Sequence, residues 1–93
     1  MPYLDVQGQR LHYSEHRSDP RRLPVPLVLV HGAGMNMMSW PPGLRRLPEH
    51  DVYAIDLPGH GRSEGPGRDT IGAYADALHE WATGLGLPAF VLA

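Results

Sequence analysis

The segment His31-Gly32-Ala33-Gly34 has the residue types needed to bind a negatively charged oxygen. It follows directly on an aliphatic run, and small residues at such a place let a substrate come close to the backbone. Backbone N–H groups fixed at the end of a strand stabilise the charge that develops on a carbonyl oxygen during acyl transfer. The segment is therefore a candidate oxyanion hole, with the N–H of Ala33 as its donor, and the plainer alternative is that its glycines only form a tight turn.

A second glycine-rich segment contains a serine in the spacing of a catalytic nucleophile. Gly61-Arg62-Ser63-Glu64-Gly65 matches G-x-S-x-G, a motif that works only on a sharp turn between a strand and a helix. Here Pro58-Gly59-His60 precedes the motif and Pro66-Gly67 follows it, so neither element is predicted beside the serine. We interpret Ser63 as a loop residue whose hydroxyl bonds nearby backbone, and not as the nucleophile.

Gly32 and Gly34 also form half of a dinucleotide-binding fingerprint, because they follow a predicted strand and Asp56 ends the next one about twenty residues later. Met37 stands where the third glycine is needed. The chain contains no lysine, which excludes a P-loop. A small nucleotide- or ligand-binding module stays open as the alternative to acyl chemistry.

Histidines are the remaining candidates for catalysis or metal binding, because the chain has no cysteine. His79-Glu80 lacks a second histidine four residues away, and no other pair has metal-ligand spacing on one element. We therefore predict no metal site. His60 borders the presumed site but has no obvious partner in the sequence. The others are interpreted as structural or solvated: His12, His16, His50 and His79.

The spacing of apolar residues along the chain alternates between patterns typical of strands and of helices, and the motifs lie between these elements. Apolar and β-branched runs predict a hairpin and three buried strands, at 3–6, 10–14, 27–30, 52–56 and 89–93. Helices are predicted over 39–47, capped by Ser39, and from the N-cap Thr70 to 84–86. The second helix is expected to bury the face that carries Ile71, Tyr74, Ala75, Leu78, Ala82 and Leu85. This order implies an α/β fold with right-handed crossovers and a parallel sheet.

Length and charge restrict the chain to one small domain. The 93 residues carry 8 basic and 10 acidic side chains, a net charge of -2 that would attract neither nucleic acid nor an anionic membrane. No apolar run approaches the length of a membrane span, and the N-terminus lacks an apolar signal core. We therefore expect a single cytoplasmic domain over residues 1–93, without nucleic-acid or membrane partners.

Two motifs taken together resemble the α/β-hydrolase superfamily. They are the aliphatic run that leads into His31–Gly34, with Trp40 after it, and the segment Asp56-Leu57-Pro58-Gly59-His60-Gly61-Arg62-Ser63. Their order and separation are most similar to the esterase-like branch, which uses neither metal nor cofactor. The resemblance implies the N-terminal part of that fold with an incomplete sheet. The hairpin would form its first two strands, and the later strands its third to fifth.

The resemblance also implies roles for single residues. Ala33 would donate the first oxyanion-hole N–H, and His31 and Gly32 would orient the loop. Together with Gly34 and Met35 they form the expected substrate-binding set. The segment from Asp56 to Ser63 would be a structural loop beside the active site.

In the superfamily the fifth strand leads into the nucleophile elbow. The nucleophile (Ser, or Asp in some members), the acid and the base are therefore expected beyond residue 93. The whole enzyme would be a serine-type hydrolase of small ester or related acyl substrates, and residues 1–93 alone would be inactive. A third alternative is a non-catalytic fragment that needs a complementary segment, with self-association through its incomplete sheet.

Overall fold

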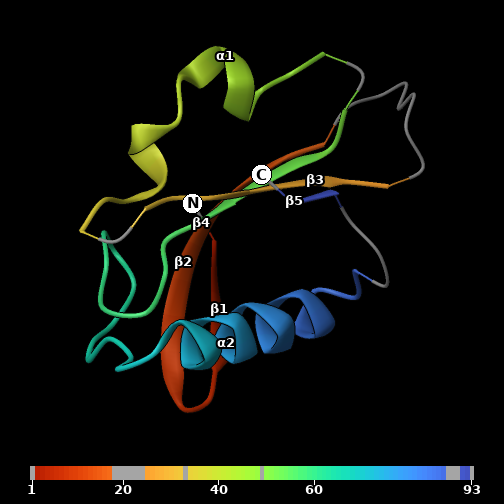
Figure 1. The fold of residues 1–93 in the computed structure, drawn as a ribbon. Helices are drawn as coiled ribbons and strands as arrows, with labels where there is room; N and C mark the ends of the chain where they lie inside the picture. Colours follow the sequence, from red (N-terminus) through yellow and green to blue (C-terminus); the bar gives the residue numbers. More distant parts are fainter. Residues whose placement is uncertain (1, 18–24, 33, 49, 88–90, 93) are drawn as a thin grey trace.

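The fold is a five-stranded mixed sheet with helical segments on both faces, in a computed structural model that describes residues 2–17, 25–32, 34–48, 50–87 and 91–92 (Figure 1). The strand order is β1-β2-β4-β3-β5. The strands are β1 (Tyr3–Val6), β2 (Gln9–His16), β3 (Leu27–Val30), β4 (Val52–Ile55) and β5 (Val91–Leu92). The helical segments are a 3-10 turn η1 (Met37–Ser39), α1 (Pro42–Arg45) and α2 (Ile71–Gly84).

The pairing of the strands confirms the predicted fold class. β1 and β2 form an antiparallel hairpin whose turn residues Gln7 and Gly8 both have positive φ, the geometry that matches strand twist. β2 then pairs antiparallel with β4, whereas β3 lies parallel to both β4 and β5. A hairpin followed by parallel β-α-β-α-β is the N-terminal arrangement of the α/β-hydrolase fold. β2 runs to His16, two residues beyond its predicted end, because the ladder with β4 continues there.

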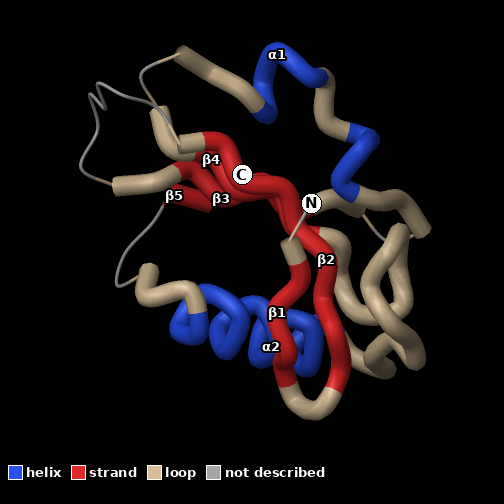
Figure 2. The backbone as a smooth tube through the Cα atoms, turned by 180° about the vertical axis from the view of Figure 1, so that it is seen from behind, coloured by secondary structure: helices blue, strands red, loops and turns tan. Residues whose placement is uncertain are grey.

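Side chains of the central strands alternate between two apolar layers, and a helix covers each layer (Figures 1 and 2). On the α2 side, Tyr53 and Ile55 pack with Tyr13 and the fully buried Trp81. On the α1 side, the buried residues are Leu29, Met37, Val52 and Ala54. Strands buried on both faces explain why β3 and β4 are continuous apolar runs rather than alternating patterns.

The helix predicted over 39–47 is wrong in its extent. Asn36 caps η1 by accepting a hydrogen bond from the Met38 N–H at 2.8 Å, so the chain turns earlier than predicted. Trp40 and Pro41 are both extended, since a residue before a proline avoids the helical region. An α-helix can therefore begin only at Pro42, and it lasts four residues. Ser39 belongs to the capping box of η1 and does not cap α1.

The long helix α2 begins as predicted but buries a somewhat different face. The Thr70 hydroxyl accepts a hydrogen bond from the Ala73 N–H at 3.1 Å, which is the expected N-cap. The fully buried positions are Ala77, Trp81 and Ala82, while Tyr74, Leu78 and Leu85 are half-buried against the core. Ile71 is 89% exposed and Ala75 is also exposed, contrary to the prediction. No helix in the described part of the chain is long and apolar enough to cross a membrane.

Candidate active-site loops

Two loops leave the sheet at the carboxyl ends of neighbouring parallel strands, where open α/β sheets bind ligands. The first follows β3 and includes residues 31–36, and the second follows β4 and runs from residue 56 to residue 69. We call them the β3 loop and the β4 loop. Figure 1 shows them side by side at one end of the sheet, and two hydrogen bonds join them, one through His31 and one through His60. Any site built here is therefore shared by both loops.

Asp56 is the central anchor of this region. Its Oδ1 accepts a hydrogen bond from the Met37 N–H at 2.7 Å. Its Oδ2 accepts from His12 Nδ1 at 2.7 Å and from the Arg62 N–H at 3.2 Å. The residue is 1% exposed, so these donors replace the water that a carboxylate needs. One side chain thus joins β2, the chain that leaves the β3 loop, and the β4 loop.

Ser63 is a structural residue of the β4 loop, as the sequence indicated. Its hydroxyl donates to the Asp56 carbonyl at 2.6 Å and accepts from the His12 N–H at 2.7 Å. The residue is buried, and its loop contains neither a strand before it nor a helix directly after it. The hydroxyl donates one hydrogen bond and accepts another, both with backbone groups, so the Ser63 side chain lacks the exposed position that a nucleophile needs.

Two histidines tie the loops to each other reciprocally. His31, on the β3 loop, accepts a hydrogen bond at Nε2 from the Leu57 N–H at 3.0 Å. His60, on the β4 loop, accepts at Nε2 from the Gly34 N–H at 3.0 Å. The ring centroids of His31 and His60 are 5.1 Å apart. Each loop therefore supplies one ring acceptor to a backbone N–H of the other.

The predicted substrate-binding residues differ in their exposure to solvent. His31 is 5% exposed, and its Nδ1 lies 2.7 Å from the Gly32 carbonyl while its Nε2 holds Leu57, so both ring nitrogens are engaged. Gly32, Gly34 and Met35 are exposed, and a turn closed by the Met35 N–H and the Gly32 carbonyl at 3.1 Å connects them. Gly34 has φ +78°, which explains the glycine there. Ala33, the predicted oxyanion donor, lies outside the described residues.

His60 and His12 have partners that the sequence did not reveal. His60 bonds Gly34 and the Pro58 carbonyl, and His12 bonds Asp56. His12 lies between Leu11 and Tyr13 in β2 and all three are buried, so its residue type is the only signal in the sequence. Among the described residues, no group of three or more His, Asp or Glu side chains gathers as a metal-ligating cluster.

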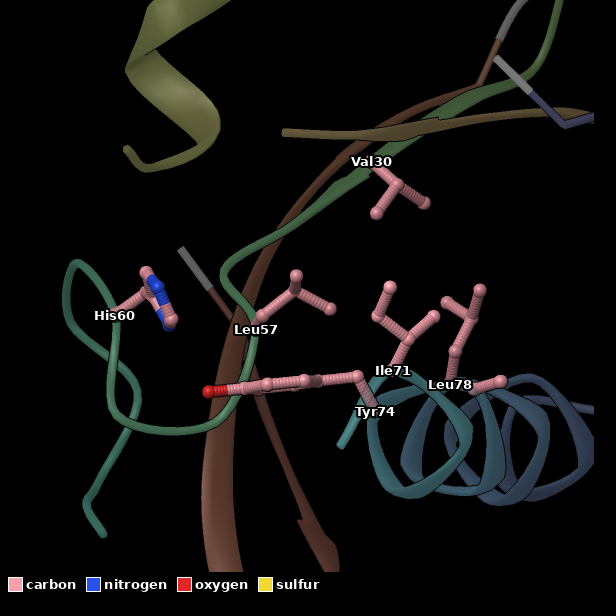
Figure 3. A pocket seen from close by; sticks show the side chains of 7 residues that line it. Val30, Leu57, His60, Ile71, Tyr74 and Leu78 are labelled. Atoms are coloured by element: carbon pink, nitrogen blue, oxygen red, sulfur yellow. The ribbon is translucent and has the colours of Figure 1, made fainter. Parts of the chain in front are cut away.

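An apolar pocket of about 370 Å³ lies between α2 and the ends of β3 and β4 (Figure 3). Its lining includes Val30, Leu57, His60, Ile71, Tyr74 and Leu78. The His60 ring meets the Tyr74 ring edge-on, with centroids 5.9 Å apart. The only titratable groups among these residues are the His60 imidazole and the Tyr74 phenol, so the pocket offers no arginine side chain to a phosphate.

Electrostatic effects are clearest at two tyrosines of the α2 face. Burial raises the pKa of Tyr13 and of Tyr53 above the usual 10.0, and the nearby Glu15 carboxylate raises both further. Arg17 acts in the opposite direction on each. Both tyrosines are therefore neutral core residues and not proton donors for chemistry near neutral pH.

Comparison with known proteins agrees with this geometry. The model of the alpha/beta hydrolase family matches residues 27–93. Pimeloyl-(acyl-carrier protein) methyl ester esterase of Pectobacterium carotovorum is 41% identical over 53 residues, which are 56% of this chain and 21% of that protein. (E)-2-((N-methylformamido)methylene)succinate hydrolase of Acinetobacter baylyi is 42% identical over 58 residues, 61% of this chain and 21% of that protein.

Solved structures show the same relationship over nearly the whole chain. A thermophilic esterase from Thermogutta terrifontis superposes with a TM-score of 0.82 at 28% identity, covering 99% of this chain and 35% of that one. The haloalkane dehalogenase DatA from Agrobacterium tumefaciens gives a TM-score of 0.80 at 27% identity, covering 98% and 30%. The chain thus spans about a fifth of the curated relatives and about a third of these structures. The tied loops, the strand order and the family match together identify the chain as a member of the alpha/beta hydrolase family.

Proposed function

We propose that this chain is the N-terminal part of a serine-type hydrolase that acts on small ester or related acyl substrates. The observation that carries the proposal is the turn closed by the Met35 N–H and the Gly32 carbonyl at the carboxyl end of β3, whose described residues are exposed and which the β4 loop holds at Gly34. An esterase and a hydrolase among the relatives support acyl chemistry. The proposal rests on these relatives and on the turn and not on the fold, which a haloalkane dehalogenase shares.

In this proposal the chain supplies part of the machinery that stabilises the transition state. The Ala33 N–H donates to the developing oxyanion, and the turn formed by Gly32, Gly34 and Met35 lies against the acyl group. His31 contributes by holding the turn rather than through a free ring nitrogen, because both nitrogens are engaged. The nucleophile, acid and base come from sequence outside these 93 residues, and no metal or cofactor takes part.

The test is ester hydrolysis by the protein as its gene encodes it. We expect turnover of p-nitrophenyl butyrate that a fluorophosphonate abolishes, with the label on a residue other than Ser63 when the digested protein is analysed by mass spectrometry. Residues 1–93 produced alone should give no turnover and no label. Labelling of Ser63, or turnover by residues 1–93, would overturn the assignment of the nucleophile. Absence of hydrolysis by the encoded protein would overturn the function.

The apolar pocket supports a second candidate, a module that binds a small apolar ligand. Its lining of aliphatic and aromatic side chains suits an alkyl or aryl group better than a nucleotide. Isothermal titration with decanoate and with ATP separates the candidates. Saturable decanoate binding that Leu78→Gln abolishes would favour the binding module, whereas micromolar ATP binding would restore the nucleotide alternative.

Self-association through the sheet is also part of the proposal. β5 pairs only with β3 among the described strands, and such an outer strand offers unpaired backbone groups. Sedimentation of residues 1–93 at increasing concentration tests it. A larger sedimentation coefficient at higher concentration is expected, and a cooperatively folded monomer would contradict both self-association and the need for a complementary segment.

A further inference from the structure

His60 has the geometry of a residue that holds the β3 loop. Its Nδ1 lies 3.0 Å from the Pro58 carbonyl, which can only accept, so Nδ1 carries the ring proton. In a neutral imidazole this leaves Nε2 as an acceptor, and Nε2 lies 3.0 Å from the donating Gly34 N–H. The local carbonyl thus selects the tautomer that the contact with Gly34 requires.

The orientation of the ring is also fixed by packing. The His31 ring lies on one side at 5.1 Å between centroids, and the Tyr74 ring meets His60 edge-on at 5.9 Å. These contacts come from the β3 loop and from α2. Through His60, the position of the Gly34 backbone therefore depends on the positions of α2 and of the β4 loop.

The conformation of Gly34 depends on its hydrogen bond to His60. Its φ of +78° is in the region that glycine enters freely, so its own sequence gives it little conformational restraint. No heavy atom of the described residues beyond its chain neighbours lies within 4 Å of the place where its side chain would begin, so packing against them does not hold Gly34 either. The hydrogen bond to His60 fixes the direction of the peptide N–H that Gly34 contributes. That N–H is already engaged and does not serve as an oxyanion donor.

We propose that His60 is a positioning residue of the hydrolase, which keeps the β3 loop in its catalytically competent conformation by accepting the Gly34 N–H. The effect on catalysis rests on the proposed function, whereas the hydrogen bond between Gly34 and His60 is independent of that function. His60 acts on the transition state only through the loop. A small displacement of groups that bind the transition state costs rate more than it costs substrate binding.

The test compares three variants of the protein as encoded. His60→Phe keeps a ring between His31 and Tyr74 but removes the acceptor. His60→Gln keeps an acceptor oxygen near the position of Nε2. His50→Phe is the matched control, because His50 makes the same bond to the carbonyl of a proline two residues earlier, at 2.6 Å, but precedes β4 at the opposite end of the strand.

We expect His60→Phe to lower kcat for p-nitrophenyl butyrate by about 10- to 100-fold with KM changed less than about threefold. His60→Gln should recover most of kcat, and His50→Phe should match the wild type. Equal kcat for His60→Phe and wild type would overturn the proposal. Equal losses of kcat in His60→Phe and His60→Gln would also overturn it, because the acceptor that His60→Gln keeps would then recover no activity.

A readout in the wild-type protein separates this inference from the proposed function. Nitrogen-15 NMR should detect a coupling across the hydrogen bond between the Gly34 amide and His60 Nε2, and slow exchange of the Gly34 N–H. If the protein hydrolyses no ester but shows the coupling, the function fails while the tie stands. If the coupling is absent and the Gly34 N–H exchanges as fast as an exposed amide, the tie fails whatever the activity. This measurement also decides the case if His60→Phe does not fold.

Discussion

His12 and Asp56 form a buried pair that joins β2 to the end of β4. His12 Nδ1 donates to Asp56 Oδ2 at 2.7 Å, and the two side chains are only 3% and 2% exposed. The backbone repeats the connection, because the Asp56 N–H donates to the His12 carbonyl at 2.9 Å. The antiparallel ladder thus continues one residue past β4, and a side-chain bond closes it.

Replacing Asp56 with Asn should destabilise the fold strongly. Oδ1 accepts one N–H and Oδ2 accepts two, so the amide of Asn faces a donor in either orientation. An unsatisfied buried donor makes the expected loss about 3 kcal/mol in the free energy of unfolding. Urea unfolding measures it, with Asp76→Asn on the exposed face of α2 as the control, expected within about 0.5 kcal/mol of wild type. Equal stabilities of the two variants would contradict the role of Asp56.

Gly61 should tolerate alanine far less than Gly86 does. Both residues have positive φ, +52° and +75°. A Cβ on Gly86 would meet no atom of the described residues within 4 Å, whereas a Cβ on Gly61 would overlap the Asp56 carboxyl group. Gly86→Ala should cost about 1–2 kcal/mol for the left-handed backbone alone. Gly61→Ala should cost at least about 2 kcal/mol more, because the overlap must be relieved. Thermal unfolding of both variants checks the difference, and equal melting temperatures would refute it.

Ser63→Ala should reduce stability without removing catalysis. The change leaves the buried His12 N–H without its acceptor and the Asp56 carbonyl without its hydroxyl donor. We expect a loss of about 1–3 kcal/mol in urea unfolding and an unchanged kcat per folded molecule. Ser39→Ala serves as the control, since Ser39 is exposed and its hydroxyl accepts only a long 3.5 Å contact. A kcat reduced to background in folded Ser63→Ala would mean that the serine is catalytic.

Alkaline pH should destabilise the protein through Tyr13 and Tyr53. Their folded-state pKa values lie above 10.0, mainly because of burial, so the folded protein holds protons that the unfolded chain has released. Their contribution to stability is complete below pH 10 and falls as the pH rises through the folded pKa values. Absorbance at 295 nm should show phenolate formation above pH 10 that decreases in Tyr13→Phe and in Tyr53→Phe. If neither variant changes the high-pH part of the titration, the assignment is wrong.

The sequence predicted the parts of this fold that depend on local patterns. The runs predicted at 27–30 and 52–56 form β3 and β4, with β4 ending one residue early at Ile55, because β-branched and aliphatic side chains suit positions buried on both faces. Thr70 caps α2 through its own hydroxyl, as predicted. The break between η1 and α1 was missed, because Asn36 and Pro41 decide it together. Prediction of the Asp56 to Ser63 segment as a structural loop is confirmed by its hydrogen bonds.

The contacts that hold the site were hidden for a different reason. His60 binds a backbone N–H that is 26 residues away in sequence, and every residue except proline has such a group. No pattern of residue types can identify that partner. The Met37 N–H likewise completes the Asp56 anchor, and the Met37 side chain is buried. The role of Ala33 stays a prediction.

The position of β4 between β2 and β3 has a consequence for synthesis on the ribosome. The N-terminal hairpin is complete at residue 16, but its sheet neighbour is residues 52–55, and His12 must wait for a partner 44 residues later. Closing so long a loop makes the pairing of β2 with β4 a late event in the growth of the chain. Until then β2 has one unpaired edge, whose free backbone groups can pair with strands of other chains.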